Sequence, residues 1–215
     1  MKIGWDPFAG LLEDQVRLIE EYERLLVEKN RLLNLISRPS EAEVRVRHIE
    51  HSLTLALRAF PDGSSVVDWG TGGGLPGIPL AIRFSNVRFH LVDSILKKVR
   101  ALESIVRALG LENVVVHRMR AEDWTTPVDY AVSRATDSLT ALWRWTEPVL
   151  SSEAAGRPEH WSPGLIALKG GDLSVEIAKL DRQSPRTTVE CIELAQATGR
   201  SEYTDKYIVC VRRAP

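Results

Sequence analysis

The pattern of hydrophobic and polar positions divides the chain into two parts. In the first part, apolar residues from Leu11 to Leu33 recur at three- and four-residue steps, and charged, mostly acidic residues occupy the other positions. This period predicts an amphipathic helix, which Ser37-Arg38-Pro39-Ser40 interrupts, and a second helix is expected through residues 51–57. Because the polar face is acidic rather than basic, we expect the apolar stripe to pack on the protein and not on a membrane.

Alternating strand and helix patterns fill the second part of the chain. Ser94 is expected to cap one of its helices and Gly110 to end it. The expected strands are residues 66–69, 87–93, 113–117, 130–133 and 165–168, and helices are expected after residue 77, at 95–109 and around 139–150. Two late apolar runs, 188–194 and 207–212, have no clear helix between them and are expected to pair antiparallel at one edge. Residues 151–163 are expected to form a surface loop.

This alternation is typical of a parallel sheet with right-handed crossovers. The predicted fold class is therefore α/β, with a Rossmann-like, doubly wound and mostly parallel sheet, an antiparallel edge and an N-terminal helical extension. We place the extension at residues 1–61 and the sheet domain at residues 62–215. A length of 215 residues suits one such domain with an appendage.

Composition limits the compartment and the partners. No apolar run approaches the roughly 20 residues needed to cross a bilayer, and the start lacks a secretory signal, so we expect a cytoplasmic protein with no membrane partner. Cys191 and Cys210 show no metal-ligand spacing and are expected to be reduced core residues, with no metal site. The net charge is −1, yet residues 83–120 hold eight basic and three acidic residues. That local excess of positive charge either binds phosphates or consists of basic side chains on solvated helix faces and strand edges.

The most informative segment is the glycine-rich loop after the first predicted strand. Its order D-x-G-x-G-x-G places Asp68 before Gly70, Gly72 and Gly74, with Leu75 where a dinucleotide fingerprint has its third glycine. Glycines let the backbone turn tightly and approach a ligand that a Cβ would repel. The order resembles motif I of the S-adenosylmethionine (SAM) methyltransferases, and an acid beside the loop suits the cationic methionine end of that cofactor. A loop of NAD type, or a purely structural one, is the alternative.

Further polar residues follow the later strands at the same edge of the sheet. Asp93 ends the second strand, where an acid can bind both ribose hydroxyls of an adenosine in SAM and NAD enzymes alike, or favour the dipole of the next helix. Ala121 and Glu122 follow the third strand, where a backbone N–H and an acid can bind an adenine ring. Arg134 follows the fourth strand, above the expected transfer site, or else forms a surface ion pair.

With these motifs the chain resembles the GidB-like 16S ribosomal RNA methyltransferases, called RsmG, which form N7-methylguanosine. The most specific match is Gly70 to Ile82, because its Leu-Pro-Gly-Ile-Pro-Leu continuation is not general to SAM enzymes. The other matches are Tyr22–Leu26, Asn34–Ser37, Arg47–Leu53, Val92–Ser94 with Lys97-Lys98, Arg120–Glu122, Ser133–Ala135 and Leu168–Gly170.

The resemblance implies SAM as cofactor and 16S rRNA or a small-subunit particle as partner. It implies cofactor contacts from Gly70, Leu75, Ala121, Glu122 and Arg134, with Asp93 on the ribose. The chain departs from the family pattern at His51, where the family often has an acid, and at Glu50 and Lys29 in the N-terminal helices.

The chemistry of guanine N7 agrees with this assignment. N7 has an in-plane lone pair and no proton, so methyl transfer needs no general base. Arg134 is expected to bind O6 or a phosphate, because N7 itself must react. The sequence lacks the N/D/S-P-P-Y/F motif of exocyclic-amine methyltransferases and the Pro-Cys nucleophile used at pyrimidine C6. Three alternatives stay open: a NAD-dependent oxidoreductase, a non-catalytic SAM- or RNA-binding module, and a methyltransferase for a small molecule or protein.

Overall fold

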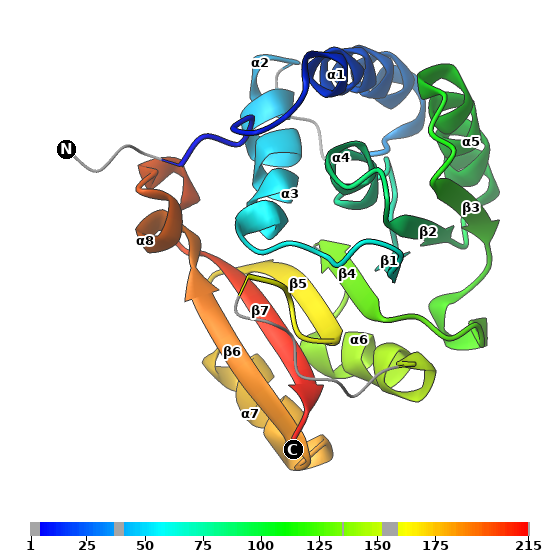
Figure 1. Cartoon of the computed structure of the whole chain (residues 1–215). Coiled ribbons are helices and arrows are strands. Elements are labelled where there is room, and N and C mark those ends of the chain that lie inside the picture. Colours follow the sequence, from blue (N-terminus) through cyan, green and yellow to red (C-terminus); the bar gives the residue numbers. More distant parts are fainter. Residues whose placement is uncertain (1–4, 37–40, 135, 152–158, 215) are drawn as a thin grey trace.

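A single sheet organises the computed structural model, which describes residues 5–36, 41–134, 136–151 and 159–214 (Figure 1). Its strands are β1 (Ser65–Trp69), β2 (Arg88–Asp93), β3 (Val114–Arg118), β4 (Tyr130–Arg134), β5 (Gly164–Gly170), β6 (Thr187–Glu193) and β7 (Lys206–Arg213). They lie in the order β3-β2-β1-β4-β5-β7-β6. The first five strands pair in parallel, and β7 pairs antiparallel with both β5 and β6. The predicted α/β fold class and its antiparallel edge are confirmed.

The strand order reverses between β1 and β4. From β1 the chain builds outward through β2 to β3, and it then returns to place β4 on the other side of β1. In open α/β sheets, ligands bind in the crevice outside the carboxyl ends of the strands at such a switch point. The glycine loop follows β1 and Arg134 ends β4, so both lie at this crevice.

Helices cover the two faces of the sheet because successive strand residues point to opposite sides. On one face, Val66 joins the core formed with α1 (Glu13–Leu33), α4 (Gly77–Arg83) and α5 (Leu96–Leu109). On the other face, the neighbouring Val67 joins the core formed with α6 (Leu139–Thr146) and α7 (Ser174–Gln183). Both strand residues are fully buried, as expected for a doubly wound sheet.

The second N-terminal helix starts earlier than its apolar pattern suggests. It is a continuous helical segment made of α2 (Glu41–Val44), a π-helical stretch (Arg45–Glu50), α3 (His51–Leu53) and a 3₁₀ turn (Thr54–Leu57). The π-helical stretch carries His48, and such stretches occur frequently at functional sites. The interruption predicted at residues 37–40 lies outside the described residues. The structure describes no helix long and apolar enough to cross a membrane.

Four local expectations need correction. Ser94 does not cap α5, because the N-cap is Ile95, whose N–H binds Asp93 Oδ1 at 2.9 Å. Residues 152–158 of the expected surface loop lie outside the described part, but Trp161 is buried and donates its indole N–H to the Leu55 carbonyl at 2.8 Å. Cys191 is exposed, because β6 is an edge strand. Finally, α8 (Leu194–Thr198) and a 3₁₀ turn (Ser201–Tyr203) separate the two late strands.

Candidate functional site

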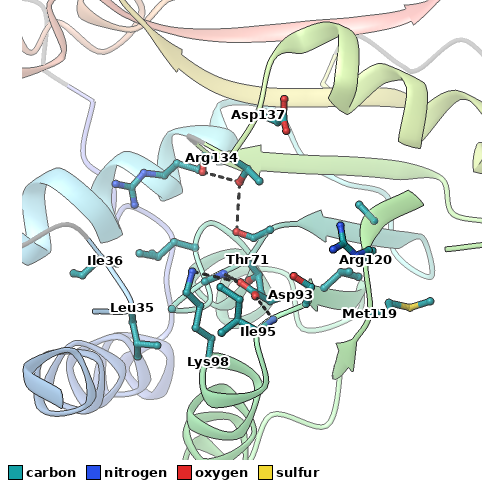
Figure 2. Close-up of a pocket in the computed structure, with 18 of the residues that line it drawn as sticks. Leu35, Ile36, Thr71, Asp93, Ile95, Lys98, Met119, Arg120, Arg134 and Asp137 are labelled. Carbon is teal, nitrogen blue, oxygen red and sulfur yellow. Dashed lines mark hydrogen bonds and ion pairs between the residues drawn. The ribbon is translucent and has the colours of Figure 1, made fainter. Parts of the chain in front are cut away.

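A cavity of about 660 Å³ opens at the carboxyl ends of β1, β2, β3 and β4. Figure 2 shows Leu35 and Ile36 on one side of it and Met119 and Arg120 on the other, with Asp93 between them. Of the predicted cofactor residues, those that line the cavity are Gly70, Gly72, Leu75, Asp93, Ala121, Glu122 and Arg134. A volume of this size suits a ligand as large as a nucleoside with a short side chain.

Hydrogen bonds join the glycine loop to strand β2 and to helix α1. Thr71 N–H binds the Val92 carbonyl at 3.0 Å, which joins the loop to β2. The buried Tyr22 hydroxyl of α1 donates to the Gly73 carbonyl at 3.0 Å, which joins it to the N-terminal helices. The loop is therefore fixed before any ligand binds.

Two of the predicted glycines are required for different steric reasons. Gly70 has φ +67°, and a Cβ there would lie 2.1 Å from Thr136 Cγ2. Gly74 has φ +98°, and its Cβ would lie within 3 Å of Ile78 and Leu102 side-chain atoms. Gly74 does not line the cavity. Its place in the motif reflects packing of the loop on α4 and α5, and Gly70 lies at the cavity itself.

Asp68 lies beneath the loop and does not line the cavity. Its side chain is fully buried, and its Oδ2 accepts hydrogen bonds from Thr71 Oγ1 at 2.7 Å and from Gly77 N at 3.0 Å. Its Oδ1 has no hydrogen-bond partner among the described residues. Burial raises the pKa of this carboxyl to about 7. The acid of the motif therefore fixes the loop and leaves one buried oxygen unsatisfied.

Asp93 occupies the centre of the cavity wall and is itself held by backbone amides. Its Oδ1 accepts from Ile95 N and its Oδ2 from Gly72 N, at 2.9 and 3.2 Å, and Lys98 Nζ lies 3.8 Å from Oδ2. These contacts leave lone pairs on both oxygens, since a carboxylate can accept about four hydrogen bonds. The carboxylate is thus oriented and still able to accept bonds from two adjacent hydroxyls.

The apolar part of the cavity was not predicted from the sequence. Ile95 is 42% exposed, although it is a large apolar residue, and it lines the cavity together with Met119 and Val92. These side chains offer an apolar surface beside the polar backbone of Ala121 and the carboxylate of Glu122. The periodic pattern assigns Ile95 to the apolar stripe of the helix expected at 95–109, which concealed its place in the cavity, and no periodic signal marks Met119, which follows β3 in a loop.

Arg134 extends from the end of β4 toward the helical segment that carries His48, away from Asp93 (Figure 2). One guanidinium nitrogen contacts His48 Nδ1. Burial lowers the pKa of Arg134 to about 10, an effect that the nearby Tyr22 and Asp68 oppose. The group stays charged at neutral pH. Instead of the surface ion pair that the sequence left open as an alternative, Arg134 is a partly buried cation next to a histidine.

The basic segment at residues 83–120 does not form one patch. In the register of the sheet, Arg88 lies opposite Ser65, at the start of β1. Arg118 lies opposite Asp93, at the other, carboxyl edge of the sheet. Lys98 and Arg120 line the cavity. Only part of the local charge excess therefore lies near the site.

Comparisons with known proteins identify the family. Residues 15–198 match the family GidB, described as "rRNA small subunit methyltransferase G". The chain belongs to this family. It is 45% identical over 211 residues to "Ribosomal RNA small subunit methyltransferase G" of Salinibacter ruber, covering 98% of both chains. It is 40% identical to the protein of the same description from Christiangramia forsetii, covering 79% of this chain and 80% of the relative.

Solved structures agree with the family at the level of the fold. The chain superposes on a ribosomal protein L11 methylase from Lactobacillus delbrueckii subsp. bulgaricus with a TM-score of 0.58 and 13% identity, over 79% of each chain. It superposes on MtNAS in complex with S-adenosylmethionine with a TM-score of 0.58 and 17% identity, over 94% of this chain and 78% of that one. Membership of the GidB family confirms the predicted methyltransferase class, and it favours that class over the oxidoreductase and the non-catalytic module.

Proposed function

We propose that this protein transfers a methyl group from SAM to N7 of a guanine in 16S rRNA. The observation that carries the proposal is the position of the glycine loop and Asp93 together on one cavity at the switch point of the sheet. The family's description as an rRNA small subunit methyltransferase supports the substrate class. SAM supplies an electrophilic methyl group on a sulfonium, and the residues of this chain have to bind and orient it.

The residues present fit such a cofactor. Asp93, oriented by two backbone amides, would accept hydrogen bonds from the two ribose hydroxyls. Ile95 and Met119 would cover the faces of the adenine ring, and Ala121 and Glu122 would bind its polar edge. The glycine loop would face the methionine end, above the unsatisfied Oδ1 of Asp68. A buried carboxylate without a full set of donors is suited to a ligand with a positive charge.

Methyl transfer to N7 asks for orientation rather than for proton transfer. Holding two reactants in line can supply about 7–11 kcal/mol of a barrier in favourable cases. Arg134 lies at the edge of the cavity, where its guanidinium would bind guanine O6 or a phosphate and leave N7 free. We therefore assign Arg134 to substrate positioning.

The direct test is to methylate small subunits that lack the modification. Purified protein, SAM and either free 16S rRNA or intact subunits are incubated, and N7-methylguanosine is mapped by borohydride and aniline cleavage. We expect one new cleavage site in at least one of the two substrates, and we expect calorimetry to detect binding of adenosylhomocysteine. The Asp93→Asn variant should weaken that binding, whereas the exposed Asp181→Asn variant should not. Absence of cleavage in both substrates would refute the proposal.

A further inference from the structure

A second cavity, of about 860 Å³, adjoins the first at His48 and Arg134, which line both. Its other lining residues come from distant parts of the chain and include Val46, Arg47, His51, Leu168, Tyr203 and Lys206. We propose that this second cavity receives the target guanine and that His48, His51 and Tyr203 bind the edge of the base. The inference rests on the proposed function and adds to it the site and the residues that select the base.

The first support is a concentration of unsatisfied polar atoms. In the described part of the chain, seven buried side-chain atoms have no hydrogen-bond partner. Three of them, His48 Nε2, His51 Nε2 and Tyr203 Oη, belong to residues that line this one cavity. The three side chains are 5%, 8% and 2% exposed. A buried polar group without a partner costs about 1–3 kcal/mol, so such a cluster indicates a ligand that supplies the partners.

The contact with Arg134 determines which proton His48 carries. A guanidinium can only donate, so His48 Nδ1 must be the acceptor in their contact. Burial, and then the charge of Arg134, lower the pKa of His48 to about 4, so the ring is neutral and its proton is on Nε2. The buried Nε2–H is therefore a donor without a partner among the described residues. It suits an acceptor such as guanine O6 and disfavours the amino group that adenine has at the same place.

His51 and Tyr203 form the other polar part of the cavity. Their rings stack with centroids 5.6 Å apart and planes 25° apart. Burial, with smaller contributions from Arg134, Lys206 and His48, lowers the pKa of His51 to about 3, so this ring is also neutral. A neutral imidazole and a phenol can both accept hydrogen bonds, which suits the N1–H and amino donors of guanine. The acid that the family often has in place of His51 could accept the same bonds.

The distribution of charge favours a nucleobase over a free anion. The unsatisfied atoms of the lining residues His48, His51 and Tyr203 are neutral, and Val46 and Leu168 add apolar surface. Lys169 is held by Glu176 at 2.8 Å and the exposed Arg47 by Glu43 at 2.7 Å, and Lys206 is a further exposed cation at the cavity. A nucleotide of an unstacked RNA segment presents a neutral base and a charged backbone in this arrangement.

The geometry also explains how N7 would face the cofactor cavity. O6 and N7 lie side by side on the same edge of guanine. His48 and Arg134 lie where the two cavities meet, so a base whose O6 binds His48 Nε2–H has N7 at the same boundary. His48, His51 and Tyr203 are thus positioning residues, and they need not exchange protons with the base.

The test removes polar atoms from the cavity wall: Tyr203→Phe removes one hydroxyl and keeps the ring, and His51→Phe replaces the imidazole, with both its nitrogens, by a larger phenyl ring. His51→Phe and Tyr203→Phe are each expected to lower kcat/KM for rRNA by about tenfold or more, with the dissociation constant of adenosylhomocysteine unchanged within about twofold. Because Tyr203→Phe deletes an unsatisfied buried atom and adds no volume, its melting temperature should stay the same or rise. His160→Phe, a histidine outside both cavities, is the matched control for the change of ring.

Base selection gives a second readout. The guanine that wild-type protein methylates is replaced, by ligation of a synthetic segment, with 2-aminopurine, which lacks O6 and the N1–H but keeps N7 and the amino group. This replacement should lower kcat/KM for wild type by about tenfold or more, and by a smaller factor in His48→Leu, which has already lost the donor to O6. His48→Gln, whose amide N–H reaches about as far as Nε2–H, should restore part of the preference for guanine.

Three outcomes separate the inference from the proposed function. If wild type methylates guanine N7 while His51→Phe and Tyr203→Phe keep full kcat/KM, the second cavity is not the base site. If both variants lose activity and melting temperature together, the residues are structural and the inference is wrong. If wild type methylates no rRNA guanine, the proposed function fails and the inference fails with it.

Discussion

Asp68→Asn is the substitution whose effect follows most directly from the structure. The Asp68 carboxyl is fully buried, and that burial raises its pKa to about 7, although hydrogen bonds from Thr71 and Gly77 act in the opposite direction. Asparagine has the same shape and no charge. Its carbonyl oxygen can accept the two bonds that Oδ2 accepts now, and its amide nitrogen takes the place of the unsatisfied Oδ1.

The size of the effect comes from the difference in pKa between the folded and unfolded chains. An unfolded aspartate titrates near 3.8, so between that pH and about 7 the folded protein holds a proton that the unfolded chain has lost. Asp68 therefore favours folding most at low pH, and this contribution falls by about 1.4 kcal/mol per pH unit across the interval. The total is on the order of 4 kcal/mol, and above about pH 7 it no longer changes.

Asparagine does not titrate, so the difference between the two proteins depends on pH. We expect Asp68→Asn to be more stable than wild type by a few kcal/mol at about pH 8, with the advantage smaller by roughly 2–3 kcal/mol at about pH 5. Urea unfolding at the two pH values measures both differences. Asp181→Asn, on the exposed surface of α7, is the matched control for exchanging an aspartate for an asparagine. A variant that is less stable than wild type at pH 8 would refute the account of Asp68.

The same variant separates a structural role from a role in binding. If the negative charge balances the cationic methionine end of the cofactor, Asp68→Asn should bind adenosylhomocysteine more weakly even though it is more stable. If Asp68 only fixes the loop, affinity should be kept, because both hydrogen bonds are kept. Calorimetry on the stabilised protein therefore reports on the charge alone.

Three further predictions concern the loop and Arg134. Gly70→Ala should abolish detectable adenosylhomocysteine binding by calorimetry, because its Cβ would lie 2.1 Å from Thr136 Cγ2. The control is Gly110→Ala, which has a similar φ of +63° and no atom within 4 Å of the added Cβ, and which should cost only about 1 kcal/mol of stability. Equal effects of the two variants would contradict the steric argument. Tyr22→Phe should lower the unfolding free energy by about 1–3 kcal/mol in urea, because the Gly73 carbonyl loses its buried donor, and unchanged stability would show that this bond contributes nothing. Arg134→Ala should lower the rate of rRNA methylation in a single-turnover assay, with the exposed Arg182→Ala as control, and full retention of both rate and cofactor affinity would rule out its positioning role.

The cavity at the carboxyl ends of β1 to β4 could be predicted from the sequence because the predicted residues that line it end or follow these strands. Each strand is visible in the sequence as a short apolar run. Because the carboxyl ends of parallel strands lie at one edge of the sheet, the polar residue at the end of each run can be assigned to that edge without any knowledge of side-chain packing. Asp93 and Arg134 were found in this way. The prediction that Ser94 caps α5 was wrong, because the free N–H of Ile95 donates to the carboxylate of the neighbouring Asp93.

The weaker elements gave less signal. Helix α7 has one buried residue, Leu180, so its apolar stripe is too thin to stand out, and α8 has only five residues. Trp161 is buried although the residues around it are polar, because its indole fills space beside Leu55, which lies far away in the sequence. Tertiary packing decided the place of Trp161, whereas α7 and α8 escaped prediction because their own sequence signal is weak.

The second cavity was outside the reach of strand-end reasoning. His51 comes from the N-terminal helical segment, Tyr203 from a 3₁₀ turn near the end of the chain, and no sequence pattern relates them. The sequence shows only that a residue departs from the family pattern, as His51 does at a position where the family often has an acid. The structure gives that replacement a physical meaning, because a neutral imidazole stacked on Tyr203 keeps the acceptor of a carboxylate without its charge. The charges of Arg134 and Lys206 would favour the ionised form of a carboxylate at this position, whereas the imidazole is neutral and its buried Nε2 has no hydrogen-bond partner among the described residues. Arg134 in turn donates to His48 Nδ1, which places the proton of the neutral His48 ring on Nε2. The guanidinium of Arg134 therefore acts on both histidines: its hydrogen bond fixes the tautomer of His48, and its charge helps to keep His51 neutral.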